Sequence, residues 1–96
     1  MFYLYLVSNF PNPFNDETSI VYELGRDADV QLRVYTVSGE LVKVRNEKGV
    51  TGYNRIIWDG TNKRNKPVSS GVYLYVLEAV SGEERANARS KCSVVR

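Results

Sequence analysis

Turn-forming residues recur about every eight to twelve positions in this chain of 96 residues, and β-branched and aromatic residues fill the intervals. No stretch of ten or more residues places apolar side chains at helical spacings of three and four. The pattern therefore predicts seven strands in one domain over residues 1–96, at about residues 2–8, 18–24, 29–37, 40–46, 53–58, 71–80 and 85–95. Such a count is typical of an all-β fold, an immunoglobulin-like or fibronectin-type-III-like antiparallel β-sandwich of about seven strands.

The third expected strand shows the clearest alternation. Val30, Leu32 and Val34 occupy every second position, and mostly polar residues separate them, so we expect one buried face and one wet face. The strand ends at Ser38-Gly39, where glycine accepts a positive φ without steric cost, and residues 40–46 resume the extended pattern. This indicates a hairpin.

The sixth expected strand, which begins at Gly71, is apolar on both faces. Tyr73 stands near its start, where sandwich tyrosines bond to backbone upstream in a tyrosine corner, so we expect it to point inward with Tyr75 and Leu77. The alternate side chains then form an outward apolar stripe of Val72, Leu74 and Val76. Such a stripe is either a contact surface or is covered by a loop.

The segment from Asn9 to Asn15 contains two prolines, which donate no backbone hydrogen bond, so we expect it outside any ladder. It crosses one end of the sandwich between the first two strands. We expect Phe10 and Phe14 to anchor this crossing to the core, and Asn12 and Asn15 to satisfy stranded backbone groups.

Composition limits the chemistry that the chain can perform. It has no histidine, the commonest general base and metal ligand, and 13 basic against 11 acidic residues give a net charge of only +2. Cys92 is the single cysteine, so no internal disulfide forms, and we expect it buried in step with Val94. The apolar start at residues 1–7 lacks the basic region of a secretion signal, and no window reaches the roughly 18 apolar residues of a membrane span.

Several polar and aromatic groups could in principle form a site, and we expect a structural role for each. The motif Trp58-Asp59-Gly60 is either a sugar platform with a carboxylate or, as we expect, a core tryptophan before a turn. The loop that follows contains oxygen donors that could bind calcium, but neighbouring cations oppose a divalent ion. We interpret these cations as the solvated tip of a hairpin rather than as a nucleic-acid surface. Glu83-Glu84 point to opposite faces, and Ser90 lacks partners for activation. The donors are Asp59, Asn62 and Asn65, and the cations are Lys63, Arg64 and Lys66.

Several motifs occur here in a characteristic order. They are Asn9-Phe-Pro-Asn-Pro-Phe-Asn15, Thr18-Ser-Ile20, Val37-Ser-Gly-Glu-Leu-Val42, Trp58-Asp-Gly60, Pro67-Val68, Ser70-Gly-Val-Tyr-Leu-Tyr75 and a final strand at 91–96. From about residue 6 to residue 96 the chain resembles the type A C-terminal sorting domain of type IX secretion cargo. It also resembles the related Ig-like domain of the flagellar hook-capping protein.

This resemblance implies a β-sandwich at the C-terminal end of a larger secreted bacterial protein, recognised by an export machine. It implies that recognition involves Lys91, Cys92, Val94, Val95 and Arg96. The residues expected to build the shaped end and the core are Asn12, Pro13, Phe14, Trp58, Asp59, Gly60, Gly71 and Tyr73.

We therefore expect a non-catalytic sorting or secretion module of a secreted or surface protein, exported through the periplasm, without cofactor or metal. Its expected partners are the secretion machinery or a parent catalytic domain, with no nucleic acid and no membrane insertion. One alternative is a structural assembly domain that self-associates. Another is an accessory or carbohydrate-binding module of a secreted hydrolase, which would expose two or three coplanar aromatic side chains.

Overall fold

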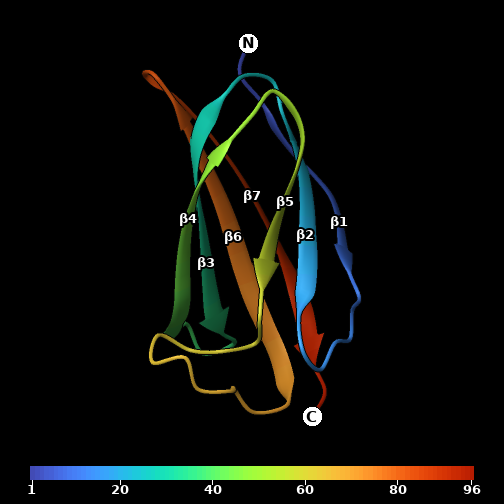
Figure 1. Cartoon of the computed structure of the whole chain (residues 1–96). Helices are drawn as coiled ribbons and strands as arrows, with labels where there is room; N and C mark the ends of the chain where they lie inside the picture. Colours follow the sequence, from blue (N-terminus) through green and yellow to red (C-terminus); the bar gives the residue numbers. More distant parts are fainter.

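The computed structural model describes residues 1–96 as seven antiparallel strands in two facing sheets (Figure 1). The strands are β1 (Leu4–Phe10), β2 (Thr18–Leu24), β3 (Ala28–Thr36), β4 (Leu41–Gly49), β5 (Gly52–Trp58), β6 (Gly71–Ser81) and β7 (Glu84–Val94). One sheet has the order β1-β2-β5 and the other β4-β3-β6-β7. The predicted all-β sandwich is confirmed. No helix of the structure has the length and apolar character needed to cross a membrane.

All seven strands lie within three residues of their expected bounds, and the main correction concerns where β1 ends. This strand continues through Asn9 and Phe10, which pair with Ile20 and Ser19 of β2. The ladder therefore enters the segment that we expected to lie outside it, and only the prolines stop it. Alternation along the strand turns Phe10 outward, where its side chain is 74% exposed, so the expectation that Phe10 anchors the crossing is wrong.

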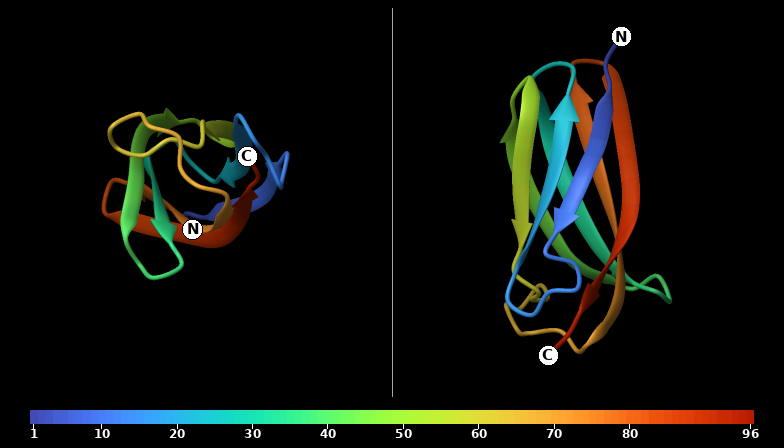
Figure 2. Two further views of the ribbon diagram at one scale, coloured as in Figure 1. Left: turned by 90° about the horizontal axis from the view of Figure 1, so that it is seen from below. Right: turned by 90° about the vertical axis from the view of Figure 1, so that its right-hand side faces the viewer.

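The core fills the space between the two sheets, which wrap around it when the molecule is viewed along its length (Figure 2). Val30, Leu32 and Val34 are buried, as their alternation predicted. Tyr75 and Leu77 of β6 pack from the same sheet, also as expected. The other sheet contributes alternate residues of β2 and β5, whose burial follows the same period of two.

The sandwich is elongated, about 40 × 22 × 20 Å, and the two chain ends lie at its opposite ends (Figure 1). The end near the C-terminus gathers the proline-rich crossing, the loop at residues 59–70 and the last residues of β7. Both X-Pro bonds of the crossing, at Pro11 and Pro13, are cis. Segments far apart in sequence therefore meet at this end.

Candidate recognition surface

The last strand is an edge strand of its sheet, paired with β6 along its length and with the proline-rich crossing at its C-terminal end. Cys92 and Val94 are each 1% exposed and belong to the core, whereas Lys91 and Val95 are exposed. Two of the five residues expected to take part in recognition are thus inaccessible in the folded domain. The other three, Lys91, Val95 and Arg96, are exposed.

The outward stripe of β6 is open to solvent. Val72 is 45% and Leu74 39% exposed, and Val76 is half-buried, so the alternative that a loop covers these side chains is wrong. Leu74 stands between Tyr35 of β3 and Lys91 of β7 in the register of the sheet. We call this surface the β6–β7 patch; its residues are Tyr35, Val72, Leu74, Val76, Arg89 and Lys91.

Cations border the β6–β7 patch on the side of β7. Arg89 lies opposite Val76, and neither Arg89 nor Lys91 makes an ion pair within the domain. A shallow groove of about 460 Å³ runs beside Leu74 and these two cations. The patch therefore combines exposed apolar area with unpaired positive charge, a combination suited to a partly apolar, acidic partner surface.

Aromatic side chains fill the end of the core that carries the proline-rich crossing. The ring centroids of Phe14 and Trp58, and of Trp58 and Tyr73, are each 5.5 Å apart in edge-to-face geometry. Trp58 is fully buried and its indole Nε1 donates to the carbonyl of Thr61 at 3.0 Å. Tyr73 donates its hydroxyl to the carbonyl of Ser69 at 2.8 Å, the geometry expected of a tyrosine corner.

The crossing is bonded directly to the end of β7. Asn12 Oδ1 accepts from the backbone N of Ser93 at 2.9 Å, as expected for a residue that satisfies stranded backbone. Phe14 forms a parallel bridge with Val94, with Phe14 N donating to the Ser93 carbonyl at 3.0 Å and Val95 N to the Phe14 carbonyl at 2.8 Å. These bonds connect residues about eighty positions apart along the chain.

Arg96 joins three further segments at the same end. Its guanidinium donates to the carbonyls of Val68 at 3.0 Å, Gly60 at 2.6 Å and Asn15 at 2.5 Å, and its backbone N donates to Ser70 Oγ at 2.8 Å. Gly60 has a φ of +69°, and a Cβ there would lie 2.8 Å from Arg96 Nη2. The backbone angle therefore favours glycine at position 60, and a side chain there would displace the Arg96 guanidinium. We call Arg96 and its partners the Arg96 cluster. Asn15 supplies its backbone carbonyl to it.

The oxygen donors weighed for calcium are occupied by groups of the protein itself. Lys43 of β4 places its Nζ 3.0 Å from Thr61 Oγ1 and from the carbonyl of Asn62, and 2.9 Å from Asn65 Oδ1. Burial favours a higher pKa for Asp59, but hydrogen bonds from Thr61 and the Lys43 charge outweigh it and lower the pKa of this carboxyl. The Lys43 ammonium group therefore occupies the position where calcium would bind.

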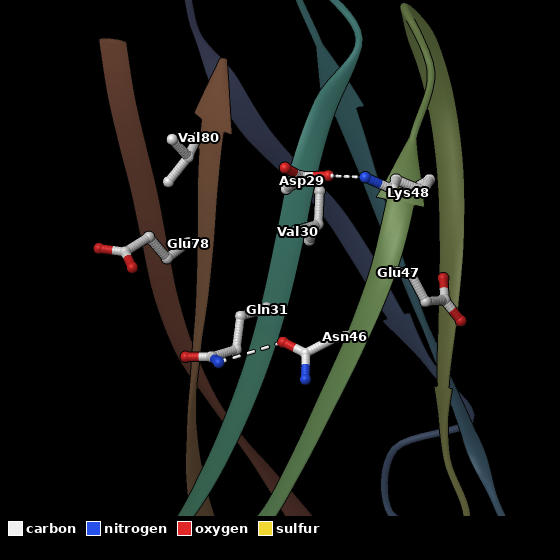
Figure 3. Close-up of a pocket in the computed structure, with 8 residues that line it drawn as sticks. All are labelled: Asp29, Val30, Gln31, Asn46, Glu47, Lys48, Glu78 and Val80. Carbon is white, nitrogen blue, oxygen red and sulfur yellow. Dashed lines mark hydrogen bonds and ion pairs between the residues drawn. The ribbon is translucent and has the colours of Figure 1, made fainter. Parts of the chain in front are cut away.

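An open groove of about 500 Å³ crosses β4, β3 and β6 (Figure 3). Its side chains pair with one another: Lys48 Nζ lies 2.6 Å from Asp29 Oδ1, and Gln31 Nε2 donates to Asn46 Oδ1 at 3.1 Å. Figure 3 shows the carboxyl groups of Glu47 and Glu78 on opposite sides of the β3-β4 pair, where they do not converge. No three potential metal ligands of the His, Cys, Asp or Glu type gather anywhere in the domain.

Taken together, these features define a class, an Ig-like β-sandwich module with an exposed apolar patch on its four-stranded sheet. The sequence model of the FlgD Ig-like domain matches residues 11–83, most of the chain, so this protein belongs to the FlgD Ig-like domain family. Comparison with the curated proteins gave no match.

Solved structures extend this result. The crystal structure of dimeric latent PorU from Porphyromonas gingivalis is similar with a TM-score of 0.81 and 26% identity over 96% of this chain, which spans only 9% of PorU. FlgD from P. aeruginosa is similar with a TM-score of 0.72 and 16% identity, covering 94% of this chain and 67% of that one. A β-glucuronidase from Parabacteroides merdae shares the fold with a TM-score of 0.58 and 13% identity, over 95% of this chain and 13% of the enzyme.

Proposed function

We propose that this domain is a non-catalytic sorting module of a larger secreted or surface bacterial protein, bound as a folded unit by the secretion machinery. The observation that carries the proposal is the β6–β7 patch, where Leu74 of β6 lies exposed beside Lys91 of the edge strand β7. A partner can bury Leu74 and pair at once with the backbone of β7 before Ser93, since the crossing bonds to this edge strand only from Ser93 onward.

The similarity to PorU supports an extracellular or surface setting, because it reaches 26% identity over 96% of this chain. Since the chain spans 9% of PorU, the larger parent protein and its activity belong to the proposal as well. Under this proposal the module is the C-terminal domain of the parent protein, which is exported through the periplasm.

Export of a reporter fused to residues 1–96, measured in a host with type IX secretion, tests the proposal. Leu74→Ser and Lys91→Glu should each reduce export, because one removes apolar contact area and the other reverses a charge at the binding edge. Val50→Ser is the matched control, because Val50 is a comparably exposed apolar residue, 55%, outside the patch. Unchanged export for both patch variants, with thermal unfolding like that of the parent domain, would contradict the assignment.

The terminal residues need point substitutions in this experiment. Deleting residues 91–96 removes Cys92 and Val94 from the core and the Arg96 cluster from the end of the sandwich. Loss of export after that deletion would report unfolding as readily as loss of a signal. Lys91→Glu and Val95→Ser leave the buried side chains in place.

Membership of the FlgD Ig-like family favours one second candidate, a structural assembly domain that stacks on copies of itself. In that case the β6–β7 patch would contact another copy of the chain. Sedimentation across a hundredfold range of concentration separates the two functions. Assembly predicts concentration-dependent mass that Leu74→Ser abolishes, whereas a sorting module stays monomeric.

A further inference from the structure

A second set of exposed aromatic side chains lies on the other sheet, away from the β6–β7 patch. Tyr5 of β1 is 68% exposed and Tyr53 of β5 is 70% exposed. Both pair in register with Glu23 of β2, so the three side chains stand in one row across the outer face. Two strand spacings of about 4.8 Å place the two tyrosine Cα atoms about 10 Å apart.

Tyr3, two residues before Tyr5, places a third ring beside this row and is held there by two hydrogen bonds. Gly25 N donates to the Tyr3 carbonyl at 3.0 Å, and the Tyr3 hydroxyl donates to Glu23 Oε2 at 3.4 Å. A Cβ at position 25 would lie 2.7 Å from Tyr3 Cδ2, so the ring rests directly on the glycine backbone. We call Tyr3, Tyr5, Glu23 and Tyr53 the tyrosine platform.

Electrostatic and packing observations agree with this placement of Tyr3. Desolvation, the Glu23 carboxylate and the nearby Tyr53 together raise the pKa of the Tyr3 hydroxyl. A shallow groove of about 450 Å³ is lined by Tyr3, Leu4, Tyr5 and Glu23. The platform therefore has one ring held in place, that of Tyr3, and a shallow recess beside the Glu23 carboxylate.

The charges on this face limit what can bind. Glu23 makes no ion pair, and neither does Arg55, which follows Tyr53 by two residues on β5 and faces the same side. An apolar protein surface would bury both charges without partners, which is costly. A polyanion would meet Glu23 with like charge, and a polycation would meet Arg55 in the same way.

A neutral sugar chain avoids these penalties. Its hydroxyl groups donate to the Glu23 carboxylate and accept from the Arg55 guanidinium, and the apolar C–H faces of its rings pack on tyrosine rings. A row of side chains that runs across three strands follows an extended ligand better than a compact one. We propose that the tyrosine platform is a binding site for neutral polysaccharide, in addition to the function proposed for the β6–β7 patch.

This site differs from the sugar platform weighed at Trp58. That tryptophan is fully buried between Phe14 and Tyr73, so its ring is not accessible to a sugar. The exposed tyrosines Tyr5 and Tyr53 lie instead on β1 and β5. Pairing across β2 brings these residues together although they are about fifty positions apart in the sequence.

Affinity electrophoresis of the 96-residue chain in gels containing soluble mannan, xylan, amylose or β-glucan tests the proposal. Dextran sulfate in a parallel gel distinguishes binding of sugar rings from ion exchange. We expect at least one neutral polymer to retard the domain. Tyr5→Ala and Tyr53→Ala should each weaken retardation about 3- to 10-fold, since each removes one stacking ring. Glu23→Ala should weaken it as well, and Glu23→Gln less, because the amide oxygen still accepts.

Val72→Ser, on the opposite sheet, is the control and should bind as the parent domain does. Trp58 fluorescence and thermal unfolding confirm that each variant folds. The proposal is overturned if no neutral polymer retards the domain, if only dextran sulfate does, or if the tyrosine variants migrate as the control does. Self-association through this face, seen as a dimer that Tyr5→Ala dissociates, would also overturn it. Export measured for the same variants keeps the two proposals separate, because Tyr5→Ala should leave export unchanged.

Discussion

Replacing Arg96 with alanine should destabilise the whole domain, although the residue lies at the surface. Its guanidinium supplies three hydrogen bonds to carbonyls of the crossing, the turn after β5 and the segment before β6. Without it, the carbonyls of Asn15, Gly60 and Val68 lose their charged donor. The substitution therefore removes three hydrogen bonds that join different segments of the chain, and not a single contact.

The magnitude follows from the geometry. A hydrogen bond to a charged group contributes about 1.5–3 kcal/mol when buried, and solvent can replace part of each bond here because Arg96 is exposed. We therefore expect a loss of about 2 kcal/mol in total for Arg96→Ala. In a domain of this size such a loss lowers Tm by about 8–16 °C.

Thermal unfolding followed by Trp58 fluorescence measures this effect, since the indole is buried beside the Arg96 cluster. Arg89→Ala is the matched control, because Arg89 is an exposed arginine of β7 without a side-chain hydrogen bond, and it should change stability by less than about 0.5 kcal/mol. Arg96→Lys should fall between the two, because an ammonium cannot reach all three carbonyls. Equal melting of the Arg96→Ala and Arg89→Ala variants would refute the reasoning.

Three further measurements test other parts of the structure. Tyr73→Phe should lose about 1 kcal/mol of stability with its bond to Ser69, while Tyr75→Phe should be neutral or slightly stabilising, because that buried hydroxyl has no hydrogen bond; denaturant titration compares the two. Burial raises the pKa of the Cys92 thiol to about 11, so native protein at pH 8 should resist a thiol reagent that labels unfolded protein at once. Because folding lowers the pKa of Asp59, its ionised carboxylate stabilises the folded domain above the unfolded pKa, and this stabilisation is lost as pH falls through the folded pKa. Thermal unfolding should therefore show that Asp59→Asn costs stability at pH 7 and little at pH 2 to 3.

Local pattern was enough to predict the layers of this fold but not the contacts at its ends. Alternation placed Val34 in the core and Leu74 on the surface, because a period of two acts over neighbouring residues and needs no knowledge of the partner strand. It misplaced Phe10, since whether a ladder continues to the residue before Pro11 depends on pairing with β2. The sequence did not predict that Lys43 donates to the oxygens of the loop at residues 59–70. This contact joins β4 to a loop about twenty residues away, and no local sequence pattern indicates it.

The tyrosine platform shows the same limit from the functional side. Tyr5, Glu23 and Tyr53 look unrelated along the chain, and only the order β1-β2-β5 and its register bring them into one row. A register shift of one residue in either pairing would turn one tyrosine toward the core and break the row. From the sequence we could state what a carbohydrate-binding surface requires, a set of exposed aromatic side chains, but we did not identify the residues.

The end of β7 has a consequence for how any receptor would recognise this domain. Cys92 and Val94 are core side chains, and the Arg96 cluster holds three distant segments together. A receptor that bound residues 91–96 as an unfolded peptide would have to extract these groups, and removing buried aliphatic side chains costs about 1.5–3 kcal/mol each. Binding to the folded domain through Lys91, Val95 and the β6–β7 patch avoids that cost. Under the sorting proposal, variants that destabilise the domain without touching the patch, such as Arg96→Ala, should therefore reduce export in proportion to the fraction unfolded.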